Sequence, residues 1–124
     1  MCIERRLNMF LYFKSDADTA FAVMRSGFIY LKDHCQDAYS GIELSKKEVE
    51  PQKGEMVLTL LVNDGVIGVV YNDNDENDSV KMSLSSLMNP SITSICEVKW
   101  FKPLTQGKVL KEFNQGRKER NFKC

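Results

Sequence analysis

The first third of the chain carries two successive patterns of apolar residues, one typical of a strand and one typical of a helix. Residues 7–14 are almost continuously apolar or aromatic, which predicts a central strand buried on both faces. The next apolar residues recur three or four positions apart: Ala17, Ala20, Phe21, Met24 and Phe28. This spacing predicts one buried helix face, so we expect a helix over about residues 16–26. A capping box at Ser15 and Asp18 begins it, and Gly27 ends it.

A β-hairpin is the clearest prediction for the middle of the chain. Apolar runs at residues 56–62 and 66–71 flank the turn-forming residues Asn63, Asp64 and Gly65. Asparagine and aspartate tolerate a positive φ angle, and glycine has no steric penalty there, so such a sequence favours a tight turn. We therefore expect the two runs to pair with one another.

Three further strands are predicted from shorter patterns. Residues 28–31 form a short apolar run, and residues 80–84 alternate between apolar and polar side chains, which is typical of a half-exposed strand. Residues 92–101 alternate again. One face of this strand is expected to carry Ile92, Ser94, Cys96, Val98 and Trp100.

The order of these elements predicts an α+β fold. A short C-terminal helix is expected at residues 108–115, with Gly116 as its stop. We expect a twisted, mostly antiparallel sheet of five or six strands with one main N-terminal helix, all in a single globular domain over residues 1–116. Residues 117–124 form a charged C-terminal tail.

Charge is balanced over the whole chain but separated along it. The 124 residues include 17 basic and 17 acidic side chains. The segment from residue 99 to the end carries eight basic and only two acidic residues. Such a separation creates two surfaces suited to different partners. The candidate acidic binding loop comprises Asp73, Asp75, Glu76 and Asp78, and the candidate basic site comprises Lys111, Arg117, Lys118 and Arg120.

The four cysteines are widely spaced and form no paired motif. The N-terminal residues contain no apolar stretch typical of a signal peptide or a membrane span, so a cytoplasmic protein without membrane contact is expected. Free thiols are the default in such a protein. Cys35 and Cys96 are expected to serve as small buried hydrophobes, and Cys2 and Cys124 to lie exposed near the termini.

Candidate chemistry is sparse. The lone histidine, His34, together with Tyr12 and Tyr39 suggests a pocket for a nucleotide. The acidic loop partly matches a calcium-binding loop, but Asp78 stands where a glycine is needed and Leu84 where a glutamate is needed. We therefore predict no metal, no cofactor and no catalytic residue, and an enzyme is the less favoured interpretation.

One stretch of sequence resembles the opening of ADP-ribosyltransferase-like domains. The resemblance rests on residues 11–15, the helix ending at Gly27, and residues 41–45, and it covers about a third of the chain. Where that family holds its nicotinamide cofactor with a polar residue and a glycine, this chain has Phe13 and Lys14. No cofactor is assigned on this basis.

The features together favour a small non-enzymatic binding protein, a regulator or inhibitor that works through protein–protein contacts. The acidic loop or the basic tail would steer a charged partner, and aromatic residues would anchor it. A nucleic-acid-binding module that uses the basic C-terminal third is the first alternative. A small enzyme or ligand-sequestering protein that uses a nucleotide is the second. Homodimerisation through Met-rich surfaces or a sheet edge is a further expectation.

Overall fold

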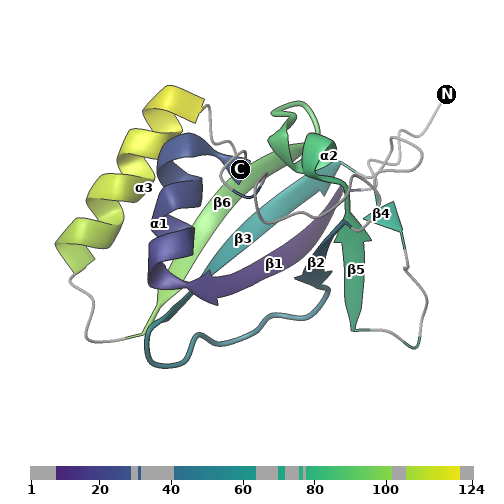
Figure 1. Ribbon diagram of the computed structural model, residues 1–124, viewed down its shortest axis with the longest axis horizontal. Helices are drawn as coiled ribbons and strands as arrows, with labels where there is room; N and C mark the ends of the chain where they lie inside the picture. Colours follow the sequence, from purple (N-terminus) through teal and green to yellow (C-terminus); the bar gives the residue numbers. More distant parts are fainter. Residues whose placement is uncertain are drawn as a thin grey trace, which may run out of the picture.

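A six-stranded antiparallel sheet in the order β4-β5-β2-β1-β3-β6 forms the frame of the molecule (Figure 1). The computed structural model describes residues 8–28, 31, 41–63, 70–71, 76, 78–101 and 106–120. The strands are β1 (Asn8–Asp16), β2 (Ile42–Ser45), β3 (Glu55–Asn63), β4 (Val70–Tyr71), β5 (Ser79–Met82) and β6 (Thr93–Trp100). The helices are α1 (Ala17–Ser26), α2 (Leu84–Met88) and α3 (Gln106–Arg120). The predicted α+β class, strand count and main N-terminal helix are confirmed.

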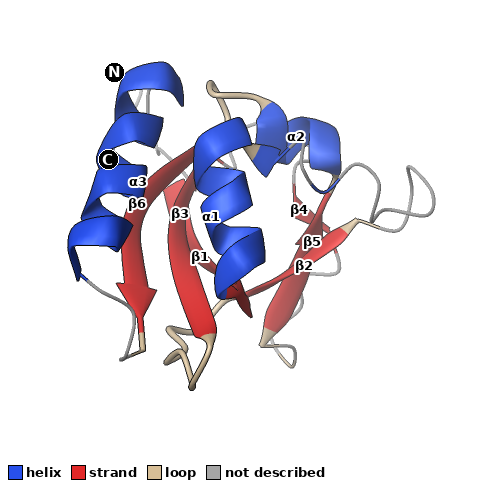
Figure 2. Ribbon diagram, turned by 60° about the vertical axis from the view of Figure 1, so that its left-hand side comes forward, coloured by secondary structure: helices blue, strands red, loops and turns tan. Residues whose placement is uncertain are grey.

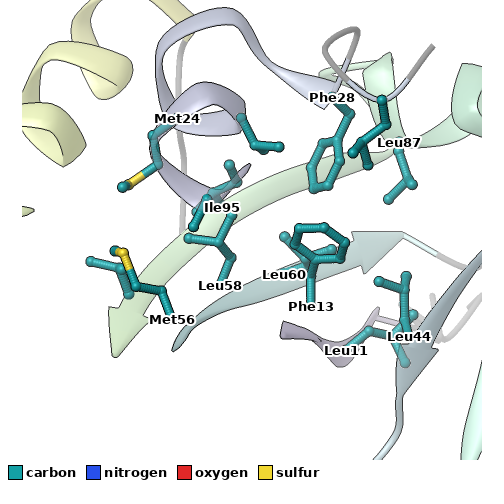
Figure 3. Packing of buried hydrophobic residues seen from close by; sticks show 14 of the residues in the cluster. Leu11, Phe13, Met24, Phe28, Leu44, Met56, Leu58, Leu60, Leu87 and Ile95 are labelled. Carbon is teal, nitrogen blue, oxygen red and sulfur yellow. The ribbon is translucent and has the colours of Figure 1, made fainter. Parts of the chain in front are cut away.

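All three helices lie on one face of the sheet, and the hydrophobic core fills the space beneath them (Figure 2). Residues paired across neighbouring strands share a face, so Leu11 lies beside Leu60 and Phe13 beside Leu58 on the helix side. The Phe13 and Phe28 rings meet edge to face, with centroids 5.6 Å apart (Figure 3). α1 closes this core with Ala20, Phe21, Val23 and Met24, all of them buried.

α1 begins at a cap one residue later than the sequence pattern suggested. Ser15 belongs to β1, and Asp16 is the N-cap, because its carboxylate accepts hydrogen bonds from the Thr19 backbone N–H at 3.0 Å and the Thr19 hydroxyl at 2.7 Å. These bonds hold the pKa of Asp16 below its ordinary value of 3.8. Gly27 ends the helix as predicted, with a φ of 76° that favours glycine.

We expect the substitution Asp16→Ala to lower the free energy of unfolding by about 0.5–2 kcal/mol at neutral pH, as cap removal generally does. The carboxyl has a depressed pKa in the folded state, so its contribution is present above the unfolded pKa and is lost as the pH falls through the folded pKa. Urea unfolding of both proteins from neutral pH to below pH 4 would measure this. The stability gap should narrow on acidification, whereas Asp18→Ala in the same helical turn should show a smaller gap at neutral pH.

The predicted hairpin after β3 is wrong. β3 pairs with β1 on one side and with β6 on the other, so no side remains for the following run. Val70 and Tyr71, the described residues of that run, pair with β5 at the far edge of the sheet instead. The turn residues Asp64 and Gly65 lie outside the described residues.

Other boundaries differ from the expectations for local reasons. Leu84 begins α2 rather than ending a strand, because Ser83 caps the helix by accepting a hydrogen bond from the Ser86 backbone N–H at 3.2 Å. Phe28 and Leu31 lie in 3₁₀ turns rather than in a strand. α3 passes through Gly116 and continues to Arg120, so the first part of the expected tail is helical.

A β-bulge in β6 changes which of its residues face the core. The pairing with β3 shifts between Thr59, opposite Glu97, and Leu60, opposite Ile95, so Cys96 is the extra residue. Val98 faces the helices as expected. On the N-terminal side of the bulge, the alternation of buried and exposed residues is the reverse of the expected one. Thr93 and Ile95 are buried there, in place of the expected Ile92 and Ser94.

Cys96 is not the buried free thiol that its sequence context predicted. It is partly exposed at the bulge and is disulfide-bonded. The other three cysteines, its partner among them, lie outside the described residues. Disulfides are typical of oxidising compartments, so the cytoplasmic location expected from the sequence stays a prediction.

α3 packs against α1 and the edge of the core. Val109 is fully buried, and Phe113 packs against the edge of the core. Towards α1, the Arg25 guanidinium binds the Glu112 carboxylate at 3.1 Å, and the Lys108 ammonium lies 4.9 Å from the centre of the Phe21 ring. Among the described residues no helix has the length and apolar character needed to cross a membrane.

Candidate functional site

The second face of the sheet, which the helices leave uncovered, is divided into a covered and an open part. On this face Val57 and Thr59 are buried although they lie outside the main core. Phe10, only two strand residues from Tyr12 on the same face, is 50% exposed. The division follows from the chain segment that connects β2 to β3.

This crossing segment, residues 46–54, passes over the second face from β2 towards β6 and returns to β3. In Figure 1 it runs from β2 past β1 to the start of β3. Lys99 of β6, which shares the second face with Val57, binds the carboxylates of Glu48 and of Glu50, the latter at 3.6 Å. The buried Pro51 lies in the same segment. Ion pairs at Lys99 therefore hold the crossing segment over the covered part of the face.

We expect Lys99→Met to loosen the crossing segment. The hydrogen bond with Glu48, reinforced by the charges of Glu48, Glu50 and Glu97, raises the pKa of Lys99 above its ordinary value of 10.5. The contact is thus fully formed below the unfolded pKa and is lost as the pH rises through the folded pKa. Hydrogen exchange at neutral pH should be faster over residues 46–54 in the variant. Lys14→Met, an exposed lysine on the same face, should leave that exchange unchanged.

The open part of the face exposes an aromatic and aliphatic surface, which we call the Phe10 patch: Phe10, Tyr12 and Leu61. Phe10 pairs with Leu61 on β3. On its other side β2 has already ended, because Ser45, its last residue, lies opposite Tyr12. The side chain of Phe10 therefore has a strand neighbour on one side only, and half of it remains in contact with solvent.

Charged side chains lie near the Phe10 patch on the same face. Lys14 of β1 and Glu97 of β6 are both exposed, and register places them on the face that carries Tyr12 and Thr59. An apolar centre bordered by charged groups of both signs is the usual make-up of a protein-binding surface.

The half-exposed Phe10 corrects the prediction that the run at 7–14 is buried on both faces. The signal was present in the polar residues of the strand. Asn8, Lys14 and Asp16 have the same parity as Phe10, whereas Met9, Leu11 and Phe13 occupy the other face. In a strand this alternation distinguishes an open face from a buried one.

The structure describes part of each site predicted from the sequence. In the acidic loop, Glu76 and Asp78 are exposed, and Asp78 binds Lys47 at 3.2 Å. Asp73 and Asp75 lie outside the described residues. On α3, Lys111 is exposed, and Arg117, Lys118 and Arg120 occupy the last helical turns, although their side chains are not described.

The predicted nucleotide pocket is described only at Tyr12, which belongs to the Phe10 patch; His34 and Tyr39 lie outside the described residues. The acidic and basic sets lie apart, since Asp78 precedes β5 near one side of the sheet and α3 lies over β6 at the other (Figure 2). Within the described part of the chain, no group of three or more His, Cys, Asp or Glu side chains is placed to hold a metal ion.

Comparison with known proteins leaves the function to be argued from these residues. No protein-family model matches the chain, and no curated protein or solved structure does so either.

Proposed function

We propose that the protein is a small non-enzymatic binding protein, a regulator or inhibitor that docks on another protein through the Phe10 patch. The observation that carries the proposal is the half-exposed Phe10 ring on a central strand, beside Tyr12 and Leu61. Aromatic anchors of this kind contribute most of the energy at protein interfaces. Because β1 pairs with β3 along its whole length, with Phe10 opposite Leu61, the anchor is presented in a fixed position and little entropy is lost on binding.

The two shifted pKa values, those of Asp16 and Lys99, have causes that do not involve catalysis. Catalytic groups usually have pKa values shifted by burial beside a charge in a cleft. Here the lowered pKa of Asp16 arises from a helix cap, and the raised pKa of Lys99 arises from exposed ion pairs that hold the crossing segment. Both shifts therefore have structural causes.

In this proposal the acidic loop acts in the approach of the partner rather than in its anchoring. The loop carries Asp73, Asp75, Glu76 and Asp78 within seven residues. Exposed like charges accelerate association with a basic surface and lose their effect at high salt. Alanine substitution of these four residues should slow association at low ionic strength and leave dissociation nearly unchanged.

The test is a pull-down from the source cell with the full chain as bait, in untreated and nuclease-treated halves. We expect a stoichiometric protein that survives nuclease, is lost with Phe10→Asp, and is retained with Met88→Asp. Met88, on α2, is 43% exposed and serves as the matched control. Equal capture by the Phe10→Asp variant would contradict the proposal.

Nucleic-acid binding is the second candidate, and the length of α3 is the observation that favours it. The helix continues to Arg120, so Lys108, Lys111, Arg117, Lys118 and Arg120 all lie on one helix. Lysines and arginines that contact phosphates give an affinity that falls steeply with salt. A pull-down signal that disappears with nuclease, and an affinity that weakens when Arg117 and Lys118 are replaced by glutamine, would favour this candidate over the first.

A further inference from the structure

The outer edge of β6 has no partner among the described strands. β6 pairs with β3 on one side, and none of the described strands pairs with its other side, where the sheet ends (Figure 2). After the bulge at Cys96, residues 97–100 form a regular edge that offers backbone donors and acceptors to another strand, and natural proteins usually cover or protect such edges. The residues of β6 indicate which kind of strand could cover this edge.

The direction of the backbone groups identifies which residues of β6 face outward. The Asn63 backbone N–H donates to the Ile92 carbonyl at 2.8 Å, so odd-numbered residues of β3 direct their backbone groups towards β6. Because such bonds alternate along an antiparallel ladder, Glu97 and Lys99, which lie opposite Thr59 and Val57, bond inward. Val98, between them, directs its N–H and C=O to the free edge.

We propose that this edge pairs with the same edge of a second copy of the chain, antiparallel and centred on Val98. Two Val98 residues related by a two-fold axis would exchange both of their outward backbone bonds. In that register Glu97 of each copy lies directly opposite Lys99 of the other. The register that satisfies the backbone bonds is thus also the one that pairs opposite charges, which is why the occupant is a second copy rather than an unrelated strand.

α3 supplies an apolar contact on the same side. Its Lys108 and Glu112 point towards α1, and Val109 and Phe113 point into the core. At 100° per residue, Leu110 then projects away from α1, towards the free edge of β6. Leu110 is 40% exposed. In the two-fold arrangement the two α3 helices approach each other across the new strand pair, and the Leu110 side chains become covered.

This surface is separate from the Phe10 patch, which lies on the face that the helices leave open. The proposed dimer therefore does not rest on the proposed function, and an experiment that contradicts one of these proposals leaves the other untouched. A two-fold dimer through β6 would carry two copies of the Phe10 patch on one continuous sheet face.

The test is the solution mass of the full chain, measured by sedimentation equilibrium over a range of concentrations. We expect twice the 14.2 kDa chain mass at high concentration, and dissociation under denaturing conditions without reductant, which excludes a disulfide between copies. A wild-type protein that stays monomeric at every concentration would overturn the proposal.

Two charge variants show whether the predicted register is correct. Glu97→Lys and Lys99→Glu each place like charges opposite one another at both symmetric positions, so each homodimer should weaken by about tenfold or more. Lys99→Glu also removes the ion pairs with Glu48 and Glu50 that hold the crossing segment, so the heterodimer described next, rather than the weakening of this homodimer, decides the register. Mixed together, the two variants regain opposite charges at every position and should form a heterodimer. Because the mixture dimerises only if both chains are folded, its formation also excludes misfolding as the cause. A wild-type dimer with no such heterodimer would mean that another surface is used.

Leu110→Glu should also dissociate the dimer, whereas Met88→Glu, at an equally exposed helical residue on α2, should not. Circular dichroism of both variants would establish that each is folded before their dimerisation is compared. Equal dimerisation by the Leu110→Glu variant would overturn the placement of α3 beside the interface.

Discussion

Replacing Phe13 with alanine should remove about 3–5 kcal/mol from the free energy of unfolding, the usual cost of deleting a buried phenylalanine. The ring is 8% exposed and lies beneath the helices, edge to face with Phe28. Its deletion removes buried apolar area, the aromatic contact and the close packing around Leu58 and Leu11 (Figure 3). Domains of this size have total stabilities of about 5–15 kcal/mol, so the variant should be close to unfolding at ordinary temperatures.

The matched control lies three residues away on the same strand. Phe10→Ala removes the same side chain from the opposite face of β1, where half of it is already in solvent. We expect this variant to lose about 1 kcal/mol or less, because surface substitutions rarely cost more. Guanidinium unfolding of the three proteins measures both values. Similar losses for the two variants would mean that the two faces of β1 are not as differently covered as described.

The second large effect is expected at α3. Val109→Asp places a charge at a fully buried position, and an uncompensated buried charge costs about 3–5 kcal/mol. α3 packs on α1 and the edge of the core and takes no part in the strand pairing, so undocking this helix should be less costly than unfolding the sheet. We therefore expect α3 to lose its hydrogen-exchange protection and become sensitive to protease, while β1 and β3 stay protected.

Leu110→Asp is the control for this substitution. It introduces the same side chain at the next residue of α3, where Leu110 is 40% exposed. At concentrations where the wild type is also monomeric, the helix should stay docked and its exchange protection should be close to that of the wild type. If the sheet strands lose protection together with α3 in the Val109→Asp variant, α3 is an integral part of the cooperative core rather than a separable element.

The elements that the sequence predicted correctly are those decided by neighbouring residues. The spacing from Ala17 to Met24 and the conformational freedom of Gly27 are enough to specify α1 within one residue. The cap was misplaced because Ser15 and Asp16 are both good caps. Which of them is used depends on β1, which continues to Asp16 in order to pair with Glu55.

The errors concern partners that are distant in the chain. The turn residues after β3 predict a hairpin on local grounds, but the two neighbouring sites of β3 are taken by β1 and β6, whose residues lie about 30 or more positions away. The bulge at Cys96 likewise follows from the pairing with Thr59 rather than from the alternation in β6 itself. Gly116 did not stop α3, since docking through Val109 and Phe113 can offset the modest cost of one helical glycine. Phe10 was overlooked for the same reason, because its exposure depends on where β2 ends.

The position of β3 between β1 and β6 has a consequence for how the chain folds as it is synthesised. When the ribosome has released β1 to β3, one side of β3 still lacks its neighbour, and six of the nine residues of that strand are apolar. Unpaired apolar strand edges are prone to aggregation, and pairings between distant segments form slowly. Nascent chains that stall before residue 93 should therefore be the species most dependent on chaperones, and the emergence of β6 should release that dependence.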